Sequence, residues 1–176
     1  MKKLLLTALF AAAAMTAGAE VQILDHQPGG CLYYPWGNLK AEVVNDTLVL
    51  KLPANASDWC GVNISINAAV DITDEIKNGK LTFQVNAGPN VAANTVGNQK
   101  FQVALSVLGP EGKTLTGTYV PVNLTLDTDP ATWQDVEIPV SKLLLPVGKQ
   151  IKNMQVQFQV LPADRSDITL RNIFIK

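Results

Sequence analysis

The chain has 176 residues and a formal net charge of −1, from 14 basic and 15 acidic side chains. Proteins that bind nucleic acid need a cationic surface, so this balance excludes that class of partner. The length is typical of one domain with one hydrophobic core. No run of like charges indicates a polyelectrolyte partner.

Residues 1–19 have the features of a secretion signal peptide. Two lysines precede an apolar run over 4–15, and the small residues Ala17–Ala19 suit a cleavage site. The run is shorter than the roughly twenty residues that span a bilayer, and no second apolar stretch is long enough. We therefore expect no membrane span, export to the periplasm or the outside of the cell, and one mature domain over 20–176.

Two cysteines, Cys31 and Cys60, lie in the expected mature part. In an oxidising compartment an even pair predicts one disulfide, which closes a loop of roughly thirty residues and contributes about 3 kcal/mol. Two distant thiols cannot complete a tetrahedral metal site. We therefore expect a structural disulfide between them.

Short segments with alternating apolar and polar residues follow one another from the start of the mature part to its end. A period of two indicates strands with one buried and one exposed face. Clusters of Gly, Pro, Asn and Asp, which favour turns, separate these segments. The predicted strands are Val21–Asp25, Leu39–Val44, Thr47–Leu52, Gly61–Asn67, Lys80–Asn86, Phe101–Leu108, Tyr119–Leu126, Gln134–Ile138, Asn153–Leu161 and Ile168–Ile175.

No sustained helical period is present, apart from short turns at 74–77 and 141–145. Many short strands with regular turns predict an all-β fold, an antiparallel β-sandwich or jelly roll. Residues 39–52 are predicted to form a hairpin around Asn45 and Asp46. In the last strand the apolar phase changes, which a bulge near Asn172 or burial on both faces would explain.

The exposed face of these strands carries amides and hydroxyls, and few charges. An amide both donates and accepts hydrogen bonds without charge, which suits neutral polyhydroxyl ligands. The pattern therefore indicates a sugar ligand. The residues concerned are Asn63, Ser65, Asn67, Thr82, Gln84, Asn86, Gln102, Ser106, Gln155, Gln157 and Gln159.

An aromatic cluster flanks the two cysteines. Tyr33, Tyr34 and Trp36 follow the first cysteine, and Trp59 precedes the second, so the predicted disulfide would bring them together. Sugar rings stack their C–H faces on aromatic planes, and Tyr and Trp suit such half-wet sites. The alternative is that one or two of these rings plug the end of the sandwich over the disulfide. We expect Trp59 to be partly in the core and Tyr34 or Trp36 to be exposed.

The candidate ligand-binding residues combine this cluster with the polar strands. Four aromatic side chains are expected to stack against the ligand, and four amides to bind its hydroxyls. They are Tyr33, Tyr34, Trp36 and Trp59, with Asn63, Gln84, Gln102 and Gln157. In contrast, Phe83, Phe101 and Phe158 are expected in the core, and Trp133 is expected to pack inward.

No arrangement of residues predicts catalysis. His26 is the only histidine, and it lies beside Asp25 just before a Pro-Gly-Gly loop, with no nucleophile signature nearby. Asp127 and Asp129 lie before Pro130, where Asp is common for backbone reasons alone. Nothing marks a pair of carboxylates as acid and base, so we predict no enzyme activity and no required cofactor.

Calcium is a separate question, because hard oxygen ligands could come from several loops. The candidates are Asp25, Asp127, Asp129, Asp164 and Asp167. No sequential calcium-loop motif is present, so these acids are interpreted as solvated turn residues, and the metal ligands stay unknown.

Several segments resemble, in their order, the galactose-binding-like jelly roll of many carbohydrate-binding modules. These are Trp59–Val62, Asp71–Thr73 before Gly79–Phe83, Trp133–Ser141 and the closing Ile168–Ile175. Among such domains the chain is similar to the C-terminal β-sandwich of bacterial family-three exo-β-glucosidases. The resemblance implies a jelly roll that binds carbohydrate, and a structural calcium ion whose ligands cannot be matched residue by residue. The chain departs from the family in standing without a catalytic domain and in its cysteine pair.

Our leading hypothesis is a secreted, non-catalytic protein that binds a neutral polysaccharide or oligosaccharide by aromatic stacking and amide hydrogen bonds. The main alternative is a structural or partner-binding module of a secreted assembly, because another protein chain or a second copy could cover the same uncharged face. An enzyme acting through unrecognised carboxylates is a third hypothesis.

Overall fold

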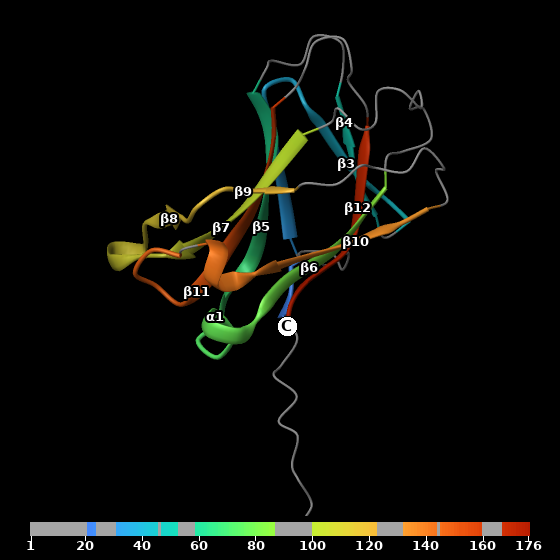
Figure 1. The fold of residues 1–176 in the computed structure, drawn as a ribbon. Helices are drawn as coiled ribbons and strands as arrows, with labels where there is room; N and C mark the ends of the chain where they lie inside the picture. The colour runs from blue at the N-terminus through green and yellow to red at the C-terminus, as the bar shows by residue number, and fades with distance from the viewer. Residues whose placement is uncertain are drawn as a thin grey trace, which may run out of the picture.

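The computed structural model describes residues 21–23, 31–45, 47–52, 59–86, 100–122, 132–143, 145–159 and 167–176. The predicted signal peptide and His26 lie outside these ranges. About two thirds of the described residues belong to strands of two antiparallel sheets, which face each other in Figure 1. The predicted all-β sandwich is therefore confirmed.

The first sheet has six strands: β1 (Val21–Gln22), β3 (Lys40–Val44), β4 (Thr47–Lys51), β6 (Lys80–Asn86), β10 (Gln134–Pro139) and β12 (Ile168–Ile175). Their order is β10-β6-β12-β4-β3, and β1 pairs with β12. We call it sheet A, and it lies on the right in Figure 1.

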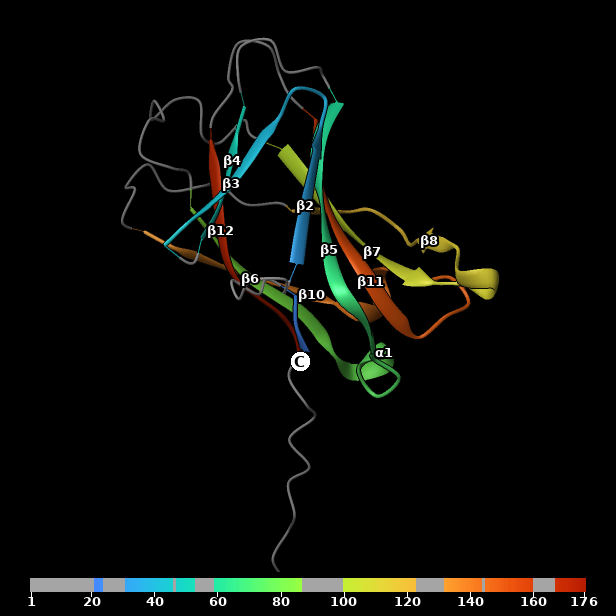
Figure 2. The ribbon, with the colours of Figure 1, turned by 180° about the vertical axis from the view of Figure 1, so that it is seen from behind.

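The second sheet, sheet B, also has six strands: β2 (Cys31–Trp36), β5 (Trp59–Asp71), β7 (Lys100–Leu108), β8 (Thr114–Thr116), β9 (Val120–Val122) and β11 (Gln150–Gln159). Their order is β2-β5-β11-β7-β8, and β9 pairs with β7. The reverse view in Figure 2 shows β2 and β5 side by side in front of β11 and β7.

The core lies between the sheets and is built by the alternation. In β5, buried Cys60, Val62, Ile64 and Ile66 alternate with more exposed polar residues. Three phenylalanines pack together between the layers. The ring centroid of Phe83 in sheet A lies 6.4 Å from that of Phe101 in sheet B, and the centroids of Phe101 and Phe158 lie 5.7 Å apart. The predicted core positions of these three rings are confirmed.

Three short helical turns complete the described fold: α1 (Glu75–Asn78), η2 (Pro110–Gly112) and η3 (Val140–Leu143). The amide of Val140 donates to the carbonyl of Gly79 at 2.9 Å, which ties η3 to the end of α1. Before α1, the Asp71 carboxylate accepts hydrogen bonds from the backbone and hydroxyl of Thr73 at 2.8 and 2.6 Å.

Strand β2 is absent from the predicted set, although it carries most of the aromatic cluster. Its segment, Cys31–Trp36, contains consecutive large residues and Pro35, so its pattern does not alternate clearly. It forms an edge strand paired only with β5, the position in a sheet where proline is tolerated. The short strand β8 was also not predicted, whereas β6 and β12 have the predicted bounds.

The predicted disulfide is wrong. Cys31 of β2 lies opposite Ile66 of β5, and Cys60 lies six residues earlier on β5. At a strand rise of about 3.3 Å per residue, the cysteines are about 20 Å apart, far beyond the roughly 7 Å limit for a disulfide. Both are separate buried thiols, because antiparallel pairing places the first cysteine at the far end of the strand from the second.

Two finer predictions are confirmed. Strands β3 and β4 form the hairpin, with Val44 opposite Thr47 and Asn45 at a positive φ of 47°. The register between β12 and β6 shifts between Arg171 and Phe174, and Asn172 has a φ of 52°. This bulge turns Ile173 inward and Phe174 outward.

Candidate ligand-binding face

The outer face of sheet B brings the aromatic cluster and part of the amide set together in cross-strand rows. Each row follows the strand order β2-β5-β11-β7, and two of the three rows continue onto β8 or β9. One row is Leu32, Ser65, Asn153, Ser106 and Thr116, the next is Tyr34, Asn63, Gln155 and Ala104, and the third is Trp36, Gly61, Gln157, Gln102 and Pro121. We call these three rows with Trp59 the aromatic–amide face.

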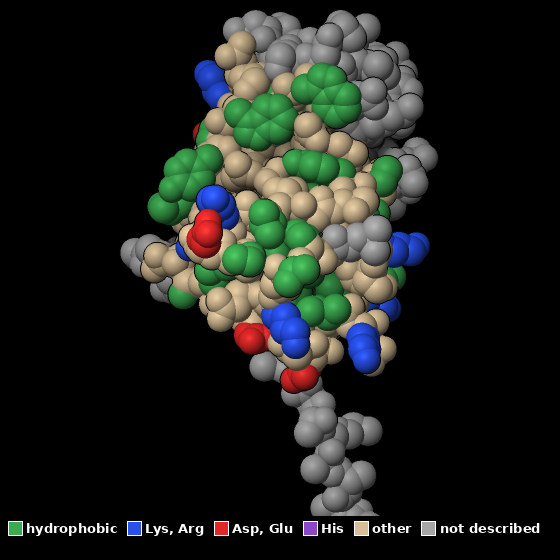
Figure 3. Space-filling view, turned by 90° about the vertical axis from the view of Figure 1, so that its left-hand side faces the viewer, with side chains coloured by type: hydrophobic (Ala, Val, Ile, Leu, Met, Phe, Trp, Pro, Cys, Tyr) green, Lys and Arg blue, Asp and Glu red, His purple; other side chains and the backbone are tan. Residues whose placement is uncertain are grey.

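Figure 3 shows the side of the molecule on which this face lies, the left-hand side of Figure 1. Hydrophobic side chains gather in its upper part, while most Lys, Arg, Asp and Glu lie around the margin. Among the described residues of the three rows, none carries a charged side chain. The face therefore suits a neutral ligand.

The aromatic part lies on β2 and the start of β5. Tyr34 is 54% exposed and Trp59 is 50% exposed, although burial is the usual position for such rings. Trp36 is half-buried because its indole lies over Gly61, where a Cβ would come within 2.7 Å of its Cζ2 atom. The missing side chain at Gly61 thus provides space for the indole against the β5 backbone.

The amide part lies on β11 and β7. Gln102 donates through Nε2 to Oε1 of Gln157 at 2.7 Å. Gln155 donates through Nε2 to the hydroxyls of Ser106 and Thr116 at 3.2 and 3.1 Å, and its Oε1 accepts from the Tyr119 hydroxyl. Burial raises the pKa of this phenol, which keeps it protonated as a donor. These contacts hold the amides in fixed orientations.

Two side-chain oxygens beneath this face have no hydrogen-bond partner among the described residues. They are Oδ1 of Asn63 and Oδ1 of Asn153, on neighbouring strands and in adjacent rows. A buried acceptor without a partner costs about 1–3 kcal/mol. Two such acceptors on one face lower the stability of the fold. Their presence fits a face whose polar groups bind a ligand.

Six of the predicted binding residues share this face, and two do not. Tyr33 points inward, packs against the core and lies with its hydroxyl 3.0 Å from Sγ of Cys31. Gln84 belongs to β6 in sheet A, on the opposite side of the molecule. Tyr33 alternates with Tyr34 and so lies on the inner face of β2. Gln84 is absent from the face because alternation does not show which sheet a strand joins.

We expected a disulfide to bring the aromatic residues together. In the structure, the pairing of β2 with β5 does so. Trp36 lies opposite Gly61, which is two residues from Trp59 on the same strand. Trp133 does not pack in the core as predicted. Trp133 lies just before β10 and is half-buried, with the Arg171 guanidinium 3.9 Å from the centroid of its ring.

Sequence reasoning missed Tyr119 as a member of the site and left Gln155 out of the binding set. Gln155 was recognisable from its place in the alternating β11 pattern. Tyr119 was not recognisable from the sequence. It precedes the short strand β9, and only the folded chain brings its hydroxyl to Gln155.

The described residues contain no group of three or more His, Cys, Asp or Glu side chains that could hold a metal ion. Asp167, one calcium candidate, accepts a hydrogen bond from the Leu52 amide at 3.1 Å. The other four candidates, Asp25, Asp127, Asp129 and Asp164, lie outside the described residues. Within the described ranges no helix is long and apolar enough to cross a membrane.

Comparison with known proteins gives matches only at the level of structure. No family model and no curated protein matches the sequence. A family 11 carbohydrate-binding module from Clostridium thermocellum, solved with a β-1,3-1,4-mixed-linked tetrasaccharide, matches with a TM-score of 0.54 at 14% identity. The match covers 89% of this chain and 94% of that module.

Two further structures match over most of the chain. The xylan-binding module CBM15 has a TM-score of 0.51 at 13% identity, and the match covers 89% of this chain and 94% of the module. The structure of PfGH50B has a TM-score of 0.53 at 11% identity, with 83% of this chain matched to only 22% of that protein. The chain therefore has the jelly-roll fold of carbohydrate-binding modules. The particular likeness to family-three glucosidase domains stays a prediction.

Proposed function

We propose that the protein is a secreted, non-catalytic carbohydrate-binding protein that holds a neutral glycan on the aromatic–amide face. The observation that carries this proposal is the register of sheet B, which places exposed aromatic rings and fixed amides in continuous rows. Two solved modules of this fold, one in complex with a mixed-linked tetrasaccharide and one xylan-binding, add support at the level of architecture.

The aromatic part supplies the stacking surface. The rings of Tyr34 and Trp59 are half exposed, and Trp36 is seated on the backbone at Gly61. Flat rings beside hydrogen-bonding groups match a ligand that has both an apolar C–H face and polar edges. A pyranose ring is such a ligand.

The amide part supplies hydrogen bonds at low entropic cost. Gln102, Gln155 and Gln157 are already held by neighbouring side chains, so a ligand need not order them. Each sugar hydroxyl exchanges a hydrogen bond to water for one to protein, so the net gain per contact is small. We therefore expect weak binding that accumulates over several sugar units.

Affinity electrophoresis in native gels tests the proposal. Mixed-linked β-glucan, xylan and agarose are the neutral probes, and alginate is the charged comparison. We expect retardation by at least one neutral polysaccharide, and we expect Tyr34→Ala or Trp59→Ala to weaken it roughly tenfold. Val44→Ala removes an exposed apolar side chain from sheet A and is the matched control.

Lack of retardation by every neutral polysaccharide, with the protein folded, would refute the proposal. Light scattering then tests the alternative of a partner-binding or self-associating module. Leu32, Tyr34 and Trp59 are exposed apolar residues of one face, and a second copy or partner protein could cover them. A stable oligomer that Tyr34→Ala dissociates would favour that alternative.

A further inference from the structure

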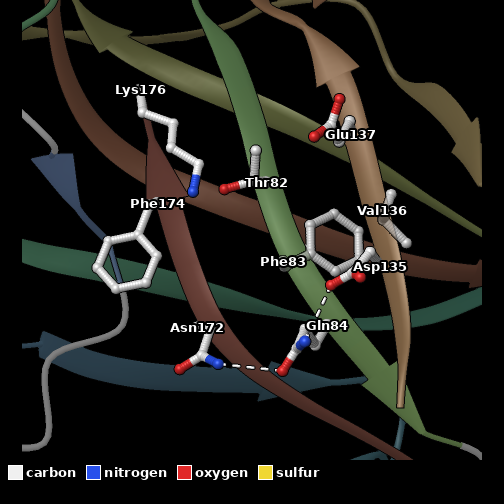
Figure 4. A pocket seen from close by; sticks show the side chains of 9 residues that line it. All are labelled: Thr82, Phe83, Gln84, Asp135, Val136, Glu137, Asn172, Phe174 and Lys176. Carbon is white, nitrogen blue, oxygen red and sulfur yellow. Dashed lines mark hydrogen bonds between the residues drawn. The ribbon is translucent and has the colours of Figure 1, made fainter. Parts of the chain in front are cut away.

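A hollow of about 300 Å³ lies on the outer face of sheet A, on the side of the molecule opposite the aromatic–amide face. Figure 4 shows its walls: Phe174 of β12 and Lys176, which follows β12, lie on one side, and Asp135 and Glu137 of β10 lie on the other. Between them, β6 contributes Thr82, which register places opposite both Phe174 and Glu137. A small residue between two large ones produces the hollow.

One wall of the hollow is a network of fixed side chains. Oε1 of Gln84 accepts from Nε of Arg171 at 2.8 Å and from Nδ2 of Asn172 at 3.0 Å. Nε2 of Gln84 donates to Oδ1 of Asp135 at 2.9 Å, as drawn in Figure 4. The guanidinium of Arg171 is in turn held over the Trp133 ring. This wall is ordered before any ligand arrives.

The bulge in β12 is what exposes the aromatic side of the hollow. Ile168 and Leu170 point inward before it, and Ile173 points inward after it. Without the extra residue, the alternation would put Phe174 in the core. Asn172 has left-handed backbone, which asparagine tolerates better than other non-glycine residues. Bulges that redirect a side chain are over-represented beside functional sites.

The charges around the hollow select against ionic ligands. Glu137 is paired with Lys80 at 2.5 Å, and Asp135 has no ion pair among the described residues. An anion would meet Asp135, and a cation would meet Lys176 on the other side. Hydroxyl groups avoid both conflicts, since they donate to carboxylates and accept from ammonium groups.

We infer that this hollow is a second binding site, which takes one neutral sugar ring with its apolar face against Phe174 and its hydroxyls on Asp135 and Glu137. Its volume is at the lower end for ligand pockets, which suits a single ring and not a chain. The site shares no residue with the aromatic–amide face. It is a separate site, and either one can fail without the other.

Amide chemical-shift titration by NMR tests the inference, with glucose, galactose, xylose and N-acetylglucosamine as probes. We expect at least one of them to shift signals of β6, β10 and β12. Thr82→Phe, which fills the hollow, and Asp135→Asn are each expected to weaken this binding roughly tenfold. Glu42→Gln, which removes a carboxylate from the far edge of the same sheet, is the matched control.

The source of the sugar is settled by repeating the titration with the matching trisaccharide. Shifts at the same strands assign the end of a chain as ligand, and shifts with the monosaccharide alone assign a free sugar. The inference is overturned if no probe shifts these signals, or if Thr82→Phe binds as tightly as the unchanged protein. Tyr34→Ala distinguishes the sites, because it should weaken polysaccharide retardation and leave these shifts unchanged.

Discussion

Gly61 shows how one residue organises the candidate face. Its missing side chain leaves the space in which the Trp36 indole lies, and a Cβ there would also come within 2.4 Å of the Val156 carbonyl oxygen. Glycine is poor in strands because it contributes no packing, so its presence in β5 marks a close approach.

Gly61→Ala is therefore expected to lower the free energy of unfolding by about 1–3 kcal/mol through overpacking and to weaken glycan retardation. Urea unfolding followed by tryptophan fluorescence measures the first effect. Ser65→Ala on the same strand is the control, with a change within about 0.5 kcal/mol. Equal stability of both variants would contradict the seated position of Trp36.

Asp71 gives a pH-dependent prediction. Hydrogen bonds from Thr73 hold the pKa of this carboxyl below its usual range, and the positive charge of Lys149 adds to the effect. Because the folded pKa is lowered, the stabilisation is present above the unfolded pKa and is lost as pH falls through the folded pKa.

We expect an NMR titration of the Asp71 carboxyl to give a midpoint below that of a free aspartate. In the variant Thr73→Val the hydroxyl is lost, and the midpoint should move back toward the usual value. An unchanged midpoint in this variant would show that the hydroxyl has no part in the shift.

At the scale of elements, alternation was reliable and non-alternating strands were missed. Strand β6 was predicted with its observed bounds because Leu81, Phe83 and Val85 are buried and their neighbours are polar or small. Strand β2 was missed because an edge strand with partly exposed aromatic residues has no such period. Most of the aromatic cluster lies in this strand.

The bulge in β12 also belongs to this scale. Asn172→Val places a β-branched residue at a φ of 52° and should destabilise the protein by about 1–2 kcal/mol. Asn172→Gly removes the same hydrogen bond to Gln84 but tolerates this backbone, so its loss should be smaller. Urea unfolding of both variants compares them directly, and equal stabilities would contradict a positive φ at this position.

For the whole molecule, stability rests on the buried core between two sheets and not on a covalent link. Phe83, Phe101 and Phe158 join the layers, and the two cysteines are separate members of the same core. The strands that carry these cysteines pair antiparallel, which keeps the thiols far apart.

The two thiols give a prediction at this scale. Protein purified without reductant and unfolded in urea is expected to react with iodoacetamide at both Cys31 and Cys60, as measured by mass spectrometry. The melting temperature should be unchanged by dithiothreitol. Modification only after reduction would mean that the thiols are joined, which would contradict the pairing of β2 with β5.

The sequence by itself determined the strands that alternate, the three core rings and the polar character of the exposed faces, because burial of every second residue is a local property of a strand. Only the tertiary structure decided which strands share a sheet. Gln84 and Gln102 have the same local pattern, yet β6 joins sheet A and β7 joins sheet B. Strand pairing between segments far apart in the chain depends on the packing of the whole core, and that pairing also placed Trp36 beside Gly61 and separated the cysteines.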